Sequence, residues 1–380
     1  TRWRCVPRLS RLPETAAEDG LYIGLMSGTS LDALDAALVE ITGGELRLRA
    51  THSHPLAEDL RNSIYALCSS GADEIDRAGP VHRQLGEAFG EASLALMAAS
   101  GTRAADIRAL GCHGQTVRHR PGPDGFSLQL GSADALAAHT GVPVVADFRN
   151  RDMVLGGQGA PLAPRFHQYL LARPESRVAV VNIGGMANLS LLDGNELVGG
   201  FDTGPGNVLI DFWCREHTGD PLDRDGAWAR QGRVQPELLE SLLADPYFQM
   251  QPPKSTGREY FHQDWLYQFS GLDTARPEDI QATLVELTAR SITDALADFA
   301  PDELRVCGGG ARNAFLMERL AAHLDPVPVT DTGSSGIAPE WIEAAAFAWL
   351  AHARLAGIAG NAPAVTGAGR PAVLGALYPA

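Results

Sequence analysis

The chain has few cysteines, no long apolar run and a deficit of positive charge. Its five cysteines are odd in number and none forms a C-x-x-C pair, so neither a disulfide framework nor a zinc knuckle is indicated. No apolar stretch approaches the ~20 residues that span a bilayer. With 31 Lys and Arg against 46 Asp and Glu, the formal net charge is -15, which argues against nucleic acid as a partner. We therefore expect a protein of the reducing cytoplasm with no membrane contact.

Several signatures of nucleotide and metal sites are also missing. The sequence contains neither a G-x-x-x-x-G-K-[ST] P-loop nor a strand-linked G-x-G-x-x-G, so P-loop and dinucleotide-binding folds are disfavoured. The zinc motif H-E-x-x-H is absent as well. No residue is therefore assigned as a direct metal ligand.

The composition is that of a globular protein long enough for two domains. The 380 residues include 45% hydrophobic and 20% charged residues, which fits a folded chain rather than a disordered one. Residues 1–20 carry several arginines but no apolar core, so we expect a poorly ordered extension there and not a secretory signal. The fold is expected to begin near Leu21.

A layout that occurs twice predicts two similar lobes. The segments YIGLMSGTSLDALDAALVEITGGELRL (22–48) and VAVVNIGGMANLSLLDGNELVGGFD (178–202) both contain a strand, a turn of small residues, a strand, a short turn with glycine and a third strand. The alternative is a pair of unrelated hairpins. We expect a first lobe at 21–155 and a second lobe at 176–337, with a C-terminal helix at 338–357 packing back on the first.

Four turns of small residues follow or join the predicted strands and suggest a nucleotide held between the lobes. Glycine has no Cβ, so backbone N–H groups in such turns can approach a phosphate closely. The last turn leads into a helix whose N-terminus favours phosphate, although a tight strand-to-helix connection explains the same residues. The four turns are Gly28–Thr29–Ser30, Gly184–Gly185, Gly204–Pro205–Gly206 and Gly308–Gly309–Gly310.

Polar side chains near strand ends are candidates for catalysis and sugar binding. Asp202 is expected at a strand end, where it can act as a general base, a role worth ~10²–10⁴ in rate. Alternatively, it caps the following turn through its own backbone. His113, Gln115 and Thr116 are expected in a polar turn that suits hydrogen bonds to a hydroxylated ligand. Arg149 precedes a Gly-rich turn and can meet a carboxylate.

Seven motifs follow one another along residues 21–357. They are GLMSGTSLDALD, CHGQTVRHRP, DFRNRDMVLGGQGAPLAPRFH, VNIGGMANLS, FDTGPGN, CGGGARN and IEAAAFAWLA. Together they resemble the successive motifs of the anhydro-N-acetylmuramic acid kinases. One departure is Ala33, where the family usually has glycine. We expect a small loss of backbone freedom there and no loss of function.

The resemblance implies an α/β fold with two RNase H-like lobes around a central nucleotide and substrate cleft, as in the acetate and sugar kinase, Hsp70 and actin superfamily. It implies an ATP-dependent kinase that opens the 1,6-anhydro ring of anhydro-N-acetylmuramic acid with water and phosphorylates O6. The product is N-acetylmuramic acid 6-phosphate, in peptidoglycan recycling. Mg²⁺ beside ATP and a homodimer are implied in the same way.

The resemblance also implies roles for individual residues. Asp202 is expected to take the proton of the attacking water, with Glu343 reaching the sugar from one side; an ordinary first-turn acid is the alternative for Glu343. The sugar is expected to contact His113, Gln115, Thr116 and Arg149. The residues expected at the nucleotide and its magnesium are Gly28, Thr29, Ser30, Leu31, Asp32, Ala33, Leu34, Asp35, Gly184, Gly185, Asn188, Gly204, Gly308, Gly309 and Gly310.

Two other functions stay open on the sequence alone. Another sugar or carboxylate kinase of the same superfamily needs no water at the anomeric carbon. A nucleotide-gated binding ATPase closes its lobes on ATP and transfers no phosphate to a ligand.

Overall fold

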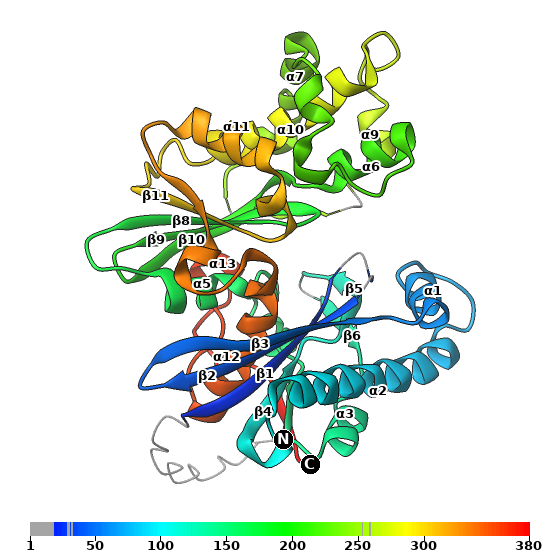
Figure 1. The fold of residues 1–380 in the computed structure, drawn as a ribbon, viewed down its shortest axis with the longest axis vertical. Coiled ribbons are helices and arrows are strands. Elements are labelled where there is room, and N and C mark those ends of the chain that lie inside the picture. The colour runs from blue at the N-terminus through cyan, green and yellow to red at the C-terminus, as the bar shows by residue number, and fades with distance from the viewer. Residues whose placement is uncertain (1–18, 29–30, 32, 123, 253, 258–259) are drawn as a thin grey trace, which may run out of the picture.

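The computed structural model describes residues 19–28, 31, 33–122, 124–252, 254–257 and 260–380. Most of the predicted N-terminal extension lies outside the described residues, as do Thr29, Ser30 and Asp32. Figure 1 shows two sheet-containing halves stacked along the long axis of the molecule. Within the described ranges, no helix is long and apolar enough to cross a bilayer.

The first half is built on a six-stranded mixed sheet. Its strands are β1 (Gly20–Ser27), β2 (Ala33–Thr42), β3 (Glu45–Pro55), β4 (Ile107–Cys112), β7 (Val144–Ala146) and β13 (Ala376–Tyr378). Their order is β13-β7-β4-β1-β2-β3. β1, β2 and β3 form an antiparallel meander, whereas β4 is parallel to β1 and β7 is parallel to β4. A separate antiparallel ribbon contains β5 (Gln115–Arg120) and β6 (Phe126–Leu130).

The second half is built on a five-stranded sheet of the same design. Its strands are β8 (Arg177–Ile183), β9 (Met186–Asp193), β10 (Glu196–Pro205), β11 (Glu303–Cys307) and β12 (Val329–Asp331). Their order is β10-β9-β8-β11-β12, with an antiparallel meander followed by two parallel strands. Both sheets therefore place the third, second and first meander strands before two parallel ones. The predicted repeat and the two-lobed α/β fold class are confirmed.

Helices cover both faces of the first sheet. The helices on one face are α1 (Glu58–Leu67), α2 (Glu74–Ser100) and α3 (Ala133–Thr140), which share a core with Ile23 and Leu25 of β1. The opposite face packs against α12 (Ile342–Ala356) through Tyr22, because neighbouring residues of a strand point to opposite sides.

Two glycines allow α12 to lie very close to the first sheet. A Cβ at Gly24 would overlap the carbonyl oxygen of Ala344, and one at Gly111 would overlap that of Phe347. Any side chain at either glycine would push the helix away from β1 and β4. The contact therefore fixes the first turn of α12 beside the first sheet, although α12 follows the second half in sequence.

The second sheet is covered mainly by helices that follow β10. They are α6 (Val208–Thr218), α7 (Pro236–Leu243), α8 (Pro246–Gln249), α9 (Gln263–Leu266), α10 (Pro277–Asp294) and α11 (Ala314–Leu324). α10 begins at Pro277 and is buried along nearly its whole length. The short helices α4 (Asn150–Val154), α5 (Ala163–Leu171) and α13 (Pro363–Thr366) complete the fold.

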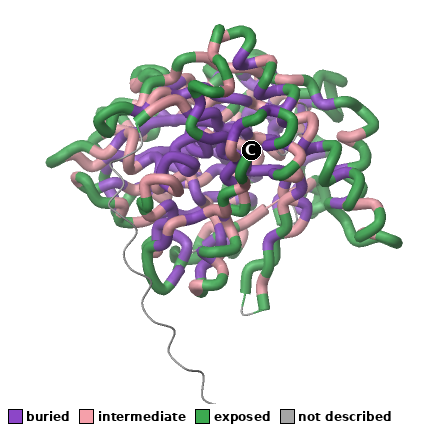
Figure 2. The backbone as a smooth tube through the Cα atoms, turned by 90° about the horizontal axis from the view of Figure 1, so that it is seen from below, coloured by how far each residue is buried: buried purple, intermediate pink, exposed green. Residues whose placement is uncertain are grey.

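A shared core joins the two halves. It combines α5 and α12 with Val178 and Val180 of β8 and with Val145 of β7. Figure 2 shows all buried residues as the purple parts of the tube, gathered in the interior with exposed segments around them. The space between the halves is thus bordered by elements that pack in this shared core.

The chain around Gly114 differs from the predicted polar turn. Strand β4 ends at Cys112, and Gly114 turns the chain with a φ of 70°. Gln115 and Thr116, expected in a polar turn, instead begin β5. The difference arises because the glycine permits a left-handed backbone that starts a new strand in a separate ribbon.

Candidate active site

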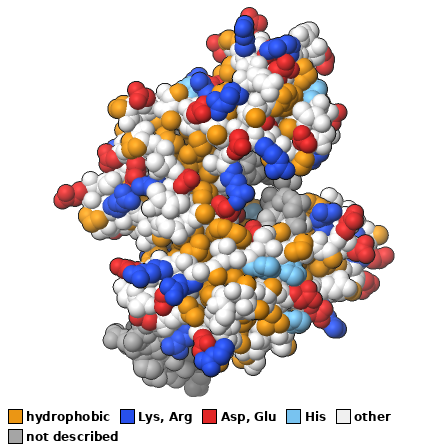
Figure 3. All heavy atoms as spheres, in the orientation of Figure 1, with side chains coloured by type: hydrophobic (Ala, Val, Ile, Leu, Met, Phe, Trp, Pro, Cys, Tyr) orange, Lys and Arg blue, Asp and Glu red, His pale blue; other side chains and the backbone are white. Residues whose placement is uncertain are grey.

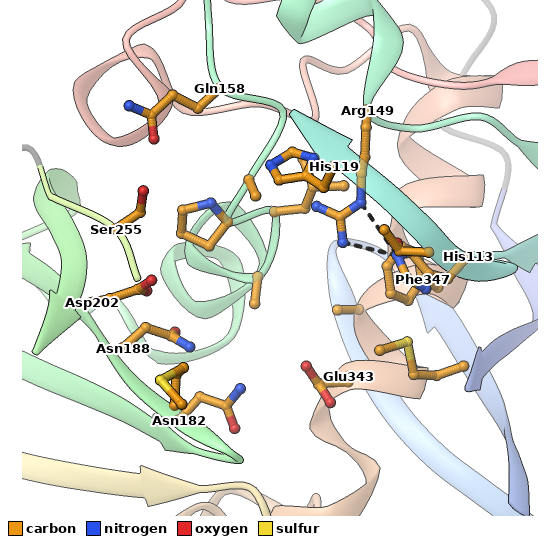
Figure 4. Close-up of a pocket in the computed structure, with 18 of the residues that line it drawn as sticks. His113, His119, Arg149, Gln158, Asn182, Asn188, Asp202, Ser255, Glu343 and Phe347 are labelled. Atoms are coloured by element: carbon orange, nitrogen blue, oxygen red, sulfur yellow. Dashed lines mark hydrogen bonds between the residues drawn. The ribbon is translucent and has the colours of Figure 1, made fainter. Parts of the chain in front are cut away.

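A cavity of about 540 Å³ lies between the two halves, a size typical of small-molecule sites. Figure 4 shows its polar side chains pointing inward from both halves. Those polar residues are Ser27, His113, Gln115, Thr116, His119, Arg149, Gln158, Asn182, Asn188, Asp202, Ser255, Thr256 and Glu343.

Arg149 and His113 form one wall of the cavity (Figure 4). The guanidinium donates to Nε2 of His113 from Nε at 3.3 Å and from Nη2 at 2.8 Å, and Nη1 donates to the carbonyl oxygen of Gly159 at 2.8 Å. Burial and the charge of Arg149 lower the pKa of His113 well below its usual value, so the imidazole is neutral. Burial lowers the pKa of Arg149 to about 10, and Glu343 opposes this shift. The guanidinium therefore stays charged at neutral pH.

Glu343 enters the cavity from the first turn of α12. Burial raises the pKa of its carboxyl; the charge of Arg149 opposes the rise, and the charge of Asp35 adds to it. A side-chain hydrogen bond from Asn182, near the end of β8, also favours the charged form. Glu343 thus keeps its proton to a higher pH than a free glutamate, a property common at functional sites.

Asp202 lies on the opposite side of the cavity from Glu343 (Figure 4). β10 continues beyond Asp202, contrary to the predicted strand end, and has a bulge between Asp202 and Gly204. Bulges commonly re-aim side chains next to active sites. The backbone N–H of Thr256 donates to Oδ2 of Asp202 at 2.9 Å, and the Tyr247 hydroxyl donates to the Asp202 carbonyl oxygen at 2.7 Å. The carboxylate is therefore held in a defined orientation.

Gln115 and Thr116 line the cavity from β5. The hydroxyl of Ser27, at the end of β1, donates to Oε1 of Gln115 at 2.6 Å. Nε2 of Gln129 donates to the Thr116 hydroxyl at 3.1 Å. The first bond ties the ribbon to the first sheet, and the second joins β6 to β5 within the ribbon. Together they give the cavity a polar edge.

Three of the predicted small-residue turns meet beside the cavity. The backbone N–H of Asn207 donates to the carbonyl oxygen of Gly184 at 2.8 Å. Gly308, with a φ of 78°, packs so closely on Asn182 that a Cβ there would overlap the amide oxygen. A Cβ at Gly309 would have only Nδ2 of Asn207 near it, at 3.8 Å. The turns after β8, β10 and β11 therefore converge next to Asn182, which itself lines the cavity.

The predicted site residues fall into three groups: those that line the cavity, those that do not, and those that lie outside the described residues. In the second group, Leu31 and Leu34 are 1% and 0% exposed in the core of the first half, and Gly204 packs against the ring of Phe248. The predicted residues that line the cavity are Asp202, Glu343, His113, Gln115, Thr116, Arg149 and Asn188. Those that do not line it are Gly28, Leu31, Ala33, Leu34, Asp35, Gly184, Gly185, Gly204, Gly308, Gly309 and Gly310. Thr29, Ser30 and Asp32 lie outside the described residues.

Sequence reasoning missed Asn182, Gln158, Ser255 and Thr256. Asn182 had a usable signal, because it is a polar residue in the otherwise apolar, buried strand VAVVNI. Ser255 and Thr256 lie in a segment without regular structure, and only their contacts with β10 bring them to the cavity. No sequence pattern could identify such a segment.

Charged side chains of both signs lie on the surface of the molecule (Figure 3). Among the described residues, no group of three His, Cys, Asp or Glu side chains is arranged to hold a metal ion. Figure 3 shows cationic and anionic side chains interspersed over the visible face. This mixture agrees with the acidic net charge of the chain.

Two lobes of one topology, a cavity with a carboxylate on each side and converging glycine turns define a two-lobed α/β enzyme that acts on a small polar ligand. The family model described as anhydro-N-acetylmuramic acid kinase matches residues 20–380. The chain belongs to this family, and its predicted class, a kinase, is confirmed.

The chain is similar to several relatives and solved structures. The anhydro-N-acetylmuramic acid kinase of Pseudomonas putida is 52% identical over 363 residues, covering 95% of this chain and 99% of that protein. The kinase of the same name from Coxiella burnetii is 49% identical over 362 residues, covering 94% and 97%. The activator of the 2-hydroxyisocaproyl-CoA dehydratase from Clostridium difficile with bound ADPNP has a TM-score of 0.45 at 13% identity, covering 87% of this chain and 94% of that one.

Proposed function

We propose that the protein opens the 1,6-anhydro ring of anhydro-N-acetylmuramic acid with water and transfers the γ-phosphate of ATP to the freed O6, in peptidoglycan recycling. Membership of the family supports the substrate and the phosphoryl transfer. The observation that carries the mechanism is that Asp202 and Glu343 line one cavity from opposite sides (Figure 4).

Asp202 acts as the general base in this proposal. It takes a proton from water while the water oxygen bonds to C1 of the sugar and the C1–O6 bond breaks. The electron pair passes to O6, which attacks the γ-phosphorus, and the bond to the β,γ-bridging oxygen breaks. One sugar, one water and one ATP thus give one sugar 6-phosphate, one ADP and one proton. Positioning supplies most of the catalysis, since the transfer needs no covalent intermediate.

Glu343 and Arg149 hold the sugar from the other side. With its raised pKa, Glu343 can donate as well as accept a hydrogen bond at the reacting end. Arg149 is fixed by His113 and Gly159 and suits the lactyl carboxylate of the muramic acid. The amide and hydroxyl of Gln115 and Thr116 suit sugar hydroxyls.

ATP binds along the converging glycine turns in this proposal. The open space at Gly309 and the backbone of the turn at Gly184 suit a nucleotide, with Asn188 between the turn and the cavity. The described side chains offer no cluster of three metal ligands, so Mg²⁺ is proposed to arrive on the ATP phosphates with water completing its shell. No step is assigned to the metal.

The domain division and the assembly are part of the same proposal. We assign the first lobe to 21–155 and the second to 176–337, with helix 338–357 joined to the first, because α12 contacts β1, β2 and β4. A homodimer and a cytoplasmic location are proposed from the family resemblance.

The test is Asp202→Asn, with the phosphorylated sugar followed by mass spectrometry. Turnover is expected to fall by ~10²–10⁴. Nucleotide affinity should change little, because the turns at Gly184 and Gly309 are untouched. Asp220→Asn, an exposed aspartate after α6, is the matched control and should keep wild-type turnover. An Asp202→Asn enzyme that retains more than roughly a tenth of the wild-type rate would remove Asp202 from the base role.

A further inference from the structure

A second cavity lies on the other face of β10 from the active site. Its volume is about 650 Å³, and β9, β10, α10 and residues 243, 248–252 and 254 contribute to its lining. Side chains of a strand alternate between faces, so Phe201 and Thr203 line this second cavity while Asp202 lines the active-site cavity. β10 is the edge strand of its sheet, and the two cavities lie back to back across it.

The wall of the second cavity is largely apolar and aromatic. Phe201, Phe248 and Phe299 line it, and Met250, which is 51% exposed, stands among the lining residues. A partly open, aromatic cavity of this volume is typical of sites for small organic molecules, which add a few polar groups for orientation.

Lys254 is the buried charge of this cavity. The residue is 9% exposed, and its Nζ donates a hydrogen bond to the carbonyl oxygen of Tyr247 at 3.3 Å. The ammonium also lies 4.8 Å from the centre of the Tyr247 ring. No carboxylate of the described residues forms an ion pair with it, and burial lowers its pKa. An anionic partner would stabilise the charged form of such a buried ammonium.

The other charges at the cavity are different in kind. Arg290 donates to Asp294 at 3.1 and 3.2 Å, so that pair neutralises itself. Asp298 is exposed and lies at the rim. Lys254 is therefore the charge that a ligand inside the cavity would meet.

We propose that this second cavity binds a small amphipathic carboxylate, with its anionic group on the Lys254 ammonium and its apolar body against Phe201 and Phe299. The anion forms an ion pair with the ammonium, and the aromatic wall supplies the apolar contact area.

The same segment connects this site to the active site. The backbone N–H of Asp202 donates to the carbonyl oxygen of Lys254 at 3.1 Å, and the N–H of Thr256 holds the Asp202 carboxylate. Tyr247 accepts from Lys254 and donates to the Asp202 carbonyl oxygen. A ligand that moves the Lys254 ammonium therefore acts on the Thr256 N–H and the Tyr247 hydroxyl, the two groups that orient Asp202. This coupling rests on the proposed function, whereas the binding itself does not.

Binding is tested by calorimetry with 4-phenylbutyrate and its uncharged analogue 4-phenylbutyramide. The carboxylate is expected to bind at one site per chain, at least tenfold more tightly than the amide. Lys254→Met should abolish that preference, whereas Arg290→Met should keep it. Ala295→Trp, which fills the cavity from the α10 side, should abolish binding of both compounds.

Three results would overturn the site: no binding to the wild-type protein, equal affinity for acid and amide, or a preference that Lys254→Met leaves unchanged. If Lys254→Met does not fold, the acid–amide comparison in the wild-type protein and the Ala295→Trp variant still decide the question.

Coupling is tested by sugar turnover at saturating 4-phenylbutyrate. A change in kcat of at least twofold is expected in the wild-type enzyme and none in Lys254→Met. An unchanged wild-type kcat contradicts the coupling, while calorimetry decides the binding site independently. Failure of the proposed sugar reaction would be seen in assays without 4-phenylbutyrate, so it is distinguishable from failure of the coupling.

Discussion

Asp152→Asn is expected to weaken sugar binding, although Asp152 does not line the active-site cavity. Asp152 lies in α4 with 0% exposure. Its Oδ2 accepts from the backbone N–H of Gly159 at 2.8 Å. Its Oδ1 accepts from Nδ2 of Asn361 and from the hydroxyl of Thr366, both at 2.8 Å. The carboxylate thus ties the loop at Gly159, which lies beside the cavity, to the C-terminal segment at Asn361 and Thr366.

The size of the effect follows from the loss of one acceptor. In Asp152→Asn, the amide oxygen can keep Asn361 and Thr366, but the amide nitrogen then faces the N–H of Gly159, donor against donor. A hydrogen bond to a charged acceptor is worth about 1.5–3 kcal/mol. The Gly159 carbonyl oxygen accepts from Arg149 at 2.8 Å, so a displaced Gly159 misplaces the guanidinium. If about half of that energy, about 0.75–1.5 kcal/mol, is lost from the contact of Arg149 with the sugar, the KM for the sugar rises roughly three- to twelvefold.

The assay compares KM for the sugar, KM for ATP and kcat in the variant and in a matched control. Thr366→Val removes one donor to Oδ1 and leaves the Gly159 bond intact, so it should cost about 1.5–3 kcal/mol of stability with the sugar KM nearly unchanged. The KM for ATP should be unchanged in both variants. A normal sugar KM in Asp152→Asn, or an equal rise in Thr366→Val, would refute the reasoning.

Two further predictions concern pH and stability. Burial raises the pKa of Glu343, so its carboxyl, followed by NMR, should titrate above the 4.5 of a free glutamate. Arg149→Met removes a charge that lowers this pKa and should move the titration to still higher pH; a downward shift would contradict the reasoning. Glu286→Gln should lower the free energy of unfolding in chemical denaturation by about 1–3 kcal/mol, because Glu286 accepts at 2.6 Å from both Arg319 and His323, and unchanged stability would reject this. Burial raises the pKa of Glu286, but these hydrogen bonds outweigh the effect of burial, and the net shift of the pKa is downward. The contribution of Glu286 to the free energy of unfolding is therefore fully present above about pH 4.5 and is lost as the pH falls through the lowered pKa of the folded state.

The sequence predicted the repeated architecture because local patterns determine it. Two meanders with turns at Gly43–Gly44 and at Gly194 are local features, and they appear in both sheets. The polar candidates Asp202 and His113 carried motif signals, and both line the cavity. Their catalytic and binding roles stay predictions.

Other parts of the site depend on contacts that no local pattern encodes. Glu343 reaches the cavity because Gly24 and Gly111 let α12 lie against the first sheet. Ser255 and Thr256 reach it because their segment runs beside β10. These placements follow from tertiary packing between residues far apart in the chain, which a single sequence does not specify.

Isotope transfer from solvent tests the central claim most directly. The protein is incubated with anhydro-N-acetylmuramic acid and ATP in ¹⁸O-water, and the sugar product is analysed by mass spectrometry. The account predicts one ¹⁸O atom in the C1 hydroxyl of a sugar that carries phosphate on O6. A phosphorylated sugar without the label, or labelled inorganic phosphate with no phosphorylated sugar, would contradict it.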